Sequence, residues 1–134
     1  MANYVLDSYA LLSFFRNEEG ADKVQQLLKD ATANKHTLYI SCINAGEVYY
    51  MTVRKDSKDK AEFVWKAMQQ FPIKIIDIEM EFVANAAKLK AHYSISYADA
   101  FAAALTIKTK ATLVTGDDEF LSLSKEPGFK VKFL

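Results

Sequence analysis

The sequence has a single cysteine, no net charge and no long apolar run, and each of these absences excludes a class of protein. One thiol cannot form an intramolecular disulfide, and we expect Cys42, within the apolar stretch YISCINA, to fill the core. Seventeen basic and seventeen acidic residues give a formal net charge of zero, so any nucleic-acid partner must be held by local patches. The longest apolar runs are too short to span a membrane.

The start of the chain also lacks the pattern of a secretory signal. MANYVLDSYALLSFFR has neither a basic beginning nor a small-residue cleavage site, so we expect a cytoplasmic protein. Hydrophobic residues make up 51% of the chain and charged residues 25%, which is the composition of a folded protein rather than a disordered one. Because no repeat, linker or low-complexity segment divides the 134 residues, we expect a single domain over residues 1–134.

Strand patterns alternate with helical patterns along the sequence. Buried strands are predicted at 3–7, 37–41, 73–77 and 111–115, and residues 129–134 fit an edge strand with lysines facing water. Helices are predicted at 8–17, 21–31, 42–53, 63–71, 79–93 and 96–110, with a short helix at 118–124. The charged segment 54–62 is interpreted as a connection between two helices. This alternation predicts a three-layer α/β/α domain with a mainly parallel, roughly five-stranded central sheet.

Four carboxylates lie where strands lead into helices. In a parallel sheet the ligand crevice lies beyond the carboxyl ends of the strands. Asp7 directly follows the first strand, and only Gly116 separates Asp117 from the fourth. Glu47 lies on the second turn of the helix after the second strand, and Asp99 lies in the first turn of an alanine-rich helix. If the strands that carry them are neighbours, the four carboxylates converge on one space.

Such a cluster of like charges requires cations. Neighbouring carboxylates repel and raise one another's pKa values, so the ionised cluster is unstable unless a cation neutralises it. Oxygen ligands without histidine or cysteine favour Mg²⁺ or Mn²⁺. These ions suit phosphodiester hydrolysis, because they lower the pKa of the attacking water and stabilise the leaving oxygen.

Each acid also has an ordinary structural interpretation. Asp7 equally suits a helix N-cap, and Asp99 forms an S-x-x-D capping pattern with Ser96. Acids beside Gly116 are commonly part of a turn, because glycine tolerates unusual dihedral angles. Glu47 differs from the other three acids, because its position considered singly favours a functional role: an unpaired acid among apolar neighbours is costly to bury. The joint placement of the acids therefore carries the hypothesis.

Other kinds of catalytic group are not expected. The sequence contains no G-x-S-x-G nucleophile elbow, and Ser8 is interpreted as a helix cap. His36 and His92 lie in predicted helix ends or loops without a partner acid or serine at a recognisable spacing. Phosphoryl transfer through an aspartyl phosphate is disfavoured, because Tyr9 stands where a D-x-D pattern needs its second acid.

Four motifs follow one another along the chain: YVLDSYALL, SCINAGEVYY, ISYADAFAAALT and LVTGDDEF. Together they resemble the PIN-domain family of VapC-type toxins over essentially the whole chain. Carried across by motif, the metal-binding acids of that family correspond to four residues here, Asp7, Glu47, Asp99 and Asp117. The resemblance adds four supporting positions, Thr115, Asn44, Ser8 and Asp118, the last of which varies within the family.

The resemblance implies a Mg²⁺- or Mn²⁺-dependent endoribonuclease that acts as the toxin of a toxin–antitoxin pair. It also implies a homodimer and a small antitoxin protein as partners, with RNA as substrate. Arg16, on the helix that follows Asp7, is a candidate contact for an RNA phosphate. Two alternatives stay open, a PIN-domain RNA-processing nuclease that is not a toxin and a non-catalytic module that binds RNA or a protein partner.

Overall fold

A five-stranded sheet forms the centre of the computed structural model, which describes residues 2–134. The strands lie in the order β3-β2-β1-β4-β5 and have these bounds: β1 Ala2–Leu6, β2 His36–Ser41, β3 Ile73–Ile76, β4 Thr112–Thr115 and β5 Val131–Phe133. All four neighbouring pairs are parallel, and β5 is an edge strand as predicted.

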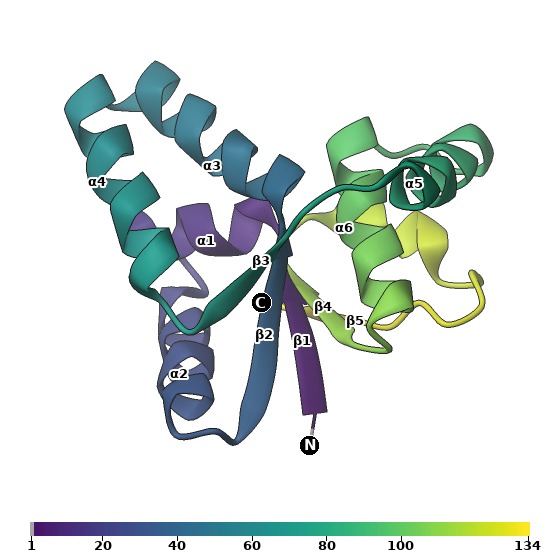
Figure 1. Ribbon diagram of the computed structural model, residues 1–134, viewed down its shortest axis with the longest axis horizontal. Coiled ribbons are helices and arrows are strands. Elements are labelled where there is room, and N and C mark those ends of the chain that lie inside the picture. Colours follow the sequence, from purple (N-terminus) through teal and green to yellow (C-terminus); the bar gives the residue numbers. More distant parts are fainter. Residues whose placement is uncertain (1) are drawn as a thin grey trace.

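Helices cover both faces of this sheet. Their bounds are α1 Ser8–Phe15, α2 Ala21–Thr32, α3 Cys42–Lys55, α4 Lys58–Gln70, α5 Met80–His92 and α6 Tyr97–Lys108, followed by the 3-10 helix η1 Asp118–Leu123. Helices α1 to α4 pack on one face, and α5, α6 and η1 pack on the other (Figure 1). The predicted three-layer α/β/α architecture is therefore confirmed. None of the helices within residues 2–134 is long and apolar enough to cross a membrane.

Alternation along the central strands divides the core into two halves. Successive side chains of a strand point to opposite faces of a sheet. Val5 and Leu113 pack with α5, α6 and η1, whereas their neighbours Leu6 and Val114 pack with α1 to α4. All four side chains are buried, which explains why these strands are continuous apolar runs in the sequence.

Side-chain caps fix the start of the helices that surround the site. Asp7, Ser41, Ser57 and Ser96 each accept a hydrogen bond from the backbone N–H three residues further along the chain. Asp7 is itself a candidate acid, and Ser41 and Ser96 cap α3 and α6, the helices that carry Glu47 and Asp99. Capping therefore sets where those helices begin relative to the strand ends.

Several sequence-based expectations are wrong. Ser8 is the first residue of α1 and not its cap, because the side chain of Asp7 caps the helix. Segment 54–62 is mostly helical, because α3 continues to Lys55 and α4 begins at Lys58, where the hydroxyl of Ser57 caps it. His36 lies in a strand rather than in a loop or helix end; it is buried, and its Nε2 lies 2.8 Å from the carbonyl oxygen of Leu27. Cys42 begins α3 and is partly exposed instead of filling the core.

The strand order creates one topological switch point. From β1 the chain moves outward through β2 to β3, and it then returns to place β4 on the other side of β1. Connections therefore leave the carboxyl ends of β1 and β4 in opposite directions and open a crevice between them. Asp7 follows β1 and Asp117 follows β4, so both lie at this crevice.

Candidate active site

Asp7 is a buried carboxylate held from two sides. Its Oδ1 accepts a hydrogen bond of 2.9 Å from the backbone N–H of Ala10 in the first turn of α1. Its Oδ2 accepts one from the hydroxyl of Thr115 at the end of β4. Asp7 is only 1% exposed, so it has both of the roles considered from the sequence: it caps α1 and lies at the crevice.

Thr115 connects the ends of β1 and β4. Its hydroxyl donates to Asp7 and accepts a hydrogen bond of 3.0 Å from the backbone N–H of Asp117. The same hydroxyl therefore fixes one acid directly and positions the backbone of the other. Because Thr115 is fully buried, water does not compete for these bonds.

Asn44 connects Glu47 to the helix that carries Asp99. Its side-chain amide donates to Oε1 of Glu47 and to the backbone carbonyl of Ala98, each at 3.1 Å. The amide oxygen in turn accepts a hydrogen bond of 2.6 Å from the hydroxyl of Ser41. Asn44 is completely buried, so its side chain fixes α3 relative to the first turn of α6.

All four predicted acids line one cleft of about 470 Å³. The predicted positions Ser8 and Arg16 line it as well, whereas Thr115 and Asn44 lie behind it and hold the acids by hydrogen bonds. The further residues along the cleft wall are Tyr9, Leu12, Ser13, Glu18, Met51, Lys55, Ser96 and Glu119. The structure thus brings together acids from four separate connections of the fold.

Glu119 belongs to the acidic cluster, although the sequence did not single it out. Carboxylate oxygens of Asp99, Asp117 and Glu119 lie within 4.8 Å of one another. Asp118 and Glu119 are both exposed, but Asp118 does not line the cleft. The cap geometry explains the difference, because Oδ1 of Asp117 accepts a hydrogen bond of 2.9 Å from the N–H of Glu119 and so turns that residue toward the acids. An Asx turn at Asp117 is the only sequence signal that points to Glu119.

Burial raises the pKa values of the two least exposed acids. The pKa of Asp7 rises from an ordinary 3.8 to about 7, mainly through desolvation, although hydrogen bonds from Thr115 and Ala10 oppose this and the charges of Asp99 and Asp117 add to it. The pKa of Asp99 rises to about 6, again mainly through desolvation and then through the charge of Asp117. Both carboxylates are therefore costly to ionise in the absence of a cation.

The donor set suits a divalent cation. Within residues 2–134, none of the cleft carboxylates has a lysine, arginine or histidine nitrogen within 4.0 Å, since the two ion pairs join Arg16 to Asp56 and Lys35 to Asp30. Unpaired acids at such short separations are the arrangement that hard cations stabilise, and the ligands are all oxygens. Asp99, Asp117 and Glu119 could hold one ion directly, with Asp7 and Glu47 beside it.

Positive charge lies along another part of the cleft wall. Arg16 and Lys55 both line it. The guanidinium of Arg16 is only loosely tied, since its Nη2 donates to the carbonyl of Met51 at 3.5 Å and its Nε lies 3.9 Å from Oδ2 of Asp56. Within the described residues, Nε of Arg16 is buried and makes no hydrogen bond. Arg16 thus places a positive charge in the cleft that also contains the acids.

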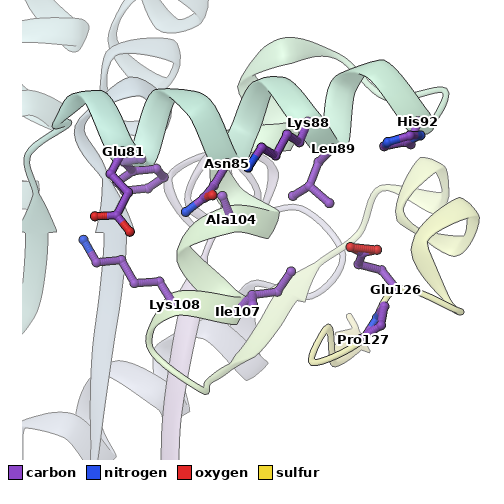
Figure 2. Close-up of a pocket in the computed structure, with 11 residues that line it drawn as sticks. Glu81, Asn85, Lys88, Leu89, His92, Ala104, Ile107, Lys108, Glu126 and Pro127 are labelled. Carbon is purple, nitrogen blue, oxygen red and sulfur yellow. The ribbon is translucent and has the colours of Figure 1, made fainter.

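A second pocket of about 370 Å³ lies between α5, α6 and the loop after η1 (Figure 2). Apolar side chains such as Leu89, Ile107 and Pro127 line it, with Glu81 and Lys108 at one end. It shares no residue with the acidic cleft and contains no cluster of acids. The acidic cleft is therefore the candidate active site.

Solved structures with this fold include toxin–antitoxin proteins. The chain is similar to a chain of VapBC2 from Rickettsia felis bound to a promoter DNA fragment, with a TM-score of 0.74, 19% identity and coverage of 98% of both chains. It is similar to a chain of DNA-bound VapBC from Salmonella typhimurium, with a TM-score of 0.73, 14% identity and coverage of 99% and 98%. It is also similar to Mycobacterium tuberculosis VapC20, a toxin that cleaves the sarcin–ricin loop, with a TM-score of 0.72, 14% identity and coverage of 92% and 95%.

At these identities the structural likeness shows the fold alone. Among curated proteins, no sequence matches significantly. The model of the PIN domain family, however, matches residues 4–126, which include all six acids that line the cleft. The chain therefore belongs to the PIN domain family.

Proposed function

We propose that this protein is a Mg²⁺- or Mn²⁺-dependent endoribonuclease that acts as the toxin of a toxin–antitoxin pair. The observation that carries the proposal is the convergence of Asp99, Asp117 and Glu119 within 4.8 Å in a cleft that also contains Asp7 and Glu47. Within the described residues, no lysine, arginine or histidine nitrogen lies within 4.0 Å of these acids, and neither histidine nor cysteine lines the cleft. Membership of the PIN domain family agrees with this chemistry.

The contacts of each residue suggest its role in binding the ion. Asp99, Asp117 and Glu119 would hold the ion, and Asp7 and Glu47 would complete its shell directly or through water. When bound, such an ion lowers the pKa of an attacking water and stabilises the leaving oxygen of a phosphodiester. Thr115 and Asn44 keep Asp7 and Glu47 in place through buried hydrogen bonds, so the ligands need little rearrangement.

Substrate binding falls to the basic residues of the same cleft. Arg16 and Lys55 would bind the phosphates that flank the scissile bond, because both line the cleft that contains the acids. Arg16 suits this role because its side chain lines the cleft and a guanidinium can bind a phosphate through two donors at once. Since the net charge of the chain is zero, these local cations supply the attraction for RNA.

The toxin role and its partners are part of the same proposal. Fold similarity to VapBC proteins from several bacteria supports a small antitoxin protein as a partner. A homodimer is expected as well. The RNA substrate is proposed from the acidic cleft and from the cleavage described for VapC20, a protein that shares the fold.

Cleavage of RNA by the purified protein tests the proposal. We expect single-stranded RNA to be cut in the presence of Mn²⁺, with cleavage lost on chelation and reduced at least roughly a thousandfold by Asp99→Asn. Asp77→Asn is a matched control, because Asp77 also follows a strand but is exposed and outside the cleft. Unchanged cleavage by Asp99→Asn would refute the assignment of the site.

Induction in a bacterium separates a toxin from a housekeeping nuclease. The intact protein is expected to arrest growth and to generate new RNA ends, whereas the Asp99→Asn protein does neither. Cleavage in vitro without growth arrest would instead favour an RNA-processing role. Failure to bind Mn²⁺ in a calorimetric titration would favour a non-catalytic module.

A further inference from the structure

Tyr9 is an aromatic side chain that the fold leaves uncovered inside the cleft. It is the second residue of α1, two positions after Asp7, and it is 47% exposed although it lines the cleft wall. The other aromatic residues of α1 behave differently, because Phe14 and Phe15 pack against each other and against Phe71. Tyr9 therefore contributes less to the core than its size would allow.

The backbone of Gly116 supports one side of the Tyr9 ring. A Cβ atom on Gly116 would lie 2.2 Å from Cε1 of Tyr9 and 2.8 Å from both Cδ1 and Cζ. The φ angle of Gly116 is not positive, so the sequence-based argument that this glycine serves an unusual dihedral angle is wrong. Gly116 instead leaves room for the ring, which rests directly on the turn between Thr115 and Asp117.

The remaining surface of Tyr9 is free to bind a ligand. Within residues 2–134, its hydroxyl makes no hydrogen bond and its ring contacts no other aromatic ring. The ring is thus held on one side by Gly116 and open on the other, in the same cleft as Asp7, Asp117 and Glu119. A flat, fixed and half-open ring beside a candidate metal site is the arrangement that a nucleobase can stack on.

Other exposed tyrosines do not have this combination of features. Tyr97 is 45% exposed, but its ring packs on Phe101 with centroids 4.9 Å apart, and it does not line the cleft. Tyr50 is 44% exposed, but its ring lies 5.1 Å from the guanidinium carbon of Arg54 and is also outside the cleft. Tyr9 alone among these three lies beside the acids.

We propose that Tyr9 is a stacking platform for an unpaired RNA base whose neighbouring phosphate lies at the acidic cluster. This inference rests on the proposed nuclease function and deepens it. A base that is already paired and stacked within a duplex cannot also lie on the ring, so the platform selects single-stranded or looped RNA. Stacking on an aromatic ring tolerates any base, because every base has a π face. Tyr9 thus favours unpaired RNA without specifying its sequence.

A fluorescence titration tests the contact directly. Trp65 is the sole tryptophan of the chain, so the double variant Trp65→Phe, Tyr9→Trp carries its one indole at position 9. We expect single-stranded RNA to quench this indole, and an otherwise identical strand that is abasic throughout to leave its fluorescence unchanged at equal concentration. Equal quenching by both strands, or none by either, would overturn the proposal.

Cleavage kinetics provide a second readout. We expect Tyr9→Leu to lower kcat/KM on single-stranded RNA about 10- to 100-fold, mostly through KM, because the energy of one stacked base is lost. Tyr9→Phe keeps the ring and should retain most of the activity. Tyr50→Leu is the matched control, because Tyr50 has similar exposure but lies outside the cleft. Thermal unfolding of each variant shows whether a loss of activity reflects a loss of fold.

The two proposals fail in different ways. If the wild-type protein cleaves RNA but Tyr9→Leu matches its kcat/KM, the platform is refuted and the nuclease proposal stands. If no cleavage occurs but the indole at position 9 is quenched only by RNA that carries bases, the platform stands and the nuclease proposal falls. If the protein neither cleaves RNA nor shows base-dependent quenching, both are refuted.

Discussion

At the scale of single residues, Asp7 is the acid of the site whose ionisation lowers the stability of the fold most. It is 1% exposed, and burial raises its pKa to about 7, whereas its ordinary value is 3.8. At a pH between these two values, Asp7 is protonated in the folded protein and ionised in the unfolded chain. Folded protein thus binds more protons than unfolded protein between about pH 4 and pH 7, so stability falls as the pH rises through this range. Asp99, with a pKa of about 6, adds to the loss.

The neutral variant Asp7→Asn should therefore be more stable than the wild type when metal is absent. With a chelator present at pH 8, we expect its Tm to exceed that of the wild type by at least about 3 °C, and we expect the difference to shrink toward pH 4. Asparagine can still accept from Ala10, and Thr115 can accept from its amide, so the packing is kept. Scanning calorimetry across this pH range measures the effect, and a lower Tm for the variant at pH 8 would contradict the argument.

Neighbouring acids at the start of η1 should differ in their importance. Both are exposed, but a carboxylate oxygen of Glu119 lies in the cluster with Asp99 and Asp117, whereas Asp118 lies outside the cleft. We expect Glu119→Gln to weaken Mn²⁺ binding at least about tenfold, as loss of a charged ligand does, and Asp118→Asn to leave it unchanged. Calorimetric titration of the two variants decides between them, and equal effects would mean that Glu119 is not a ligand.

These two residues also mark the limit of what the sequence could predict about the site. Asp7 and Asp117 could be placed together because the carboxyl ends of parallel strands meet at one edge of the sheet. Choosing between Asp118 and Glu119 depends on the turn made by Asp117, whose side chain caps η1. A turn of that kind directs side chains through dihedral angles that residue types do not reveal.

At the scale of secondary-structure elements, the packing of α6 explains why this helix is so rich in alanine. Residues 99 to 106 of this helix are all buried, so it has no polar face that would allow a large residue to reach solvent. Small side chains let it lie close to both the sheet and α5 while Asp99 stays in the cleft. The packing of α6 and the position of a candidate ligand are therefore coupled.

Enlarging one of these alanines should cost stability. Ala102 is fully buried, so we expect Ala102→Leu to lower the free energy of unfolding by about 1–3 kcal/mol through overpacking. Ala87→Leu on the exposed face of α5 is the matched control and should be nearly neutral. Chemical denaturation measures both variants, and equal stability of the two would show that α6 has room to move.

Strands and helices were predicted correctly where the apolar residues form a clear pattern, and a helix start was missed where the segment is highly charged. The strands around Val5 and Leu113 were predicted because both faces of the sheet are covered, which makes them continuous apolar runs. The start of α4 was missed because the charged segment before Phe63 was interpreted as a loop, although Ser57 supplies a helix cap. His36 was placed outside a strand because its tertiary contact with the carbonyl of Leu27 leaves no local signal.

At the scale of the whole molecule, a divalent ion should act as part of the fold. An ion that binds only the folded state stabilises it by about 2.7 kcal/mol at a hundred times its Kd. We therefore expect Mn²⁺ at pH 8 to raise the Tm of the wild type and to remove the loss of stability that the ionised Asp7 and Asp99 cause. Thermal unfolding with and without chelator measures this, with Asp99→Asn as the variant that should respond weakly. A wild-type Tm that is indifferent to Mn²⁺ would contradict a site built from these acids.

The bond between Thr115 and Asp7 joins residues 108 positions apart. A nascent chain that has reached α6 already carries Asp7, Glu47 and Asp99, but it lacks the strand that fixes Asp7 and the turn that supplies Asp117 and Glu119. Synthesis must pass β4 before the cleft is complete, and β4 begins at Thr112 of 134 residues. Assembly of the cleft therefore waits for β4 and the turn after it, which supply the last acids of the cluster and the hydroxyl that holds the first.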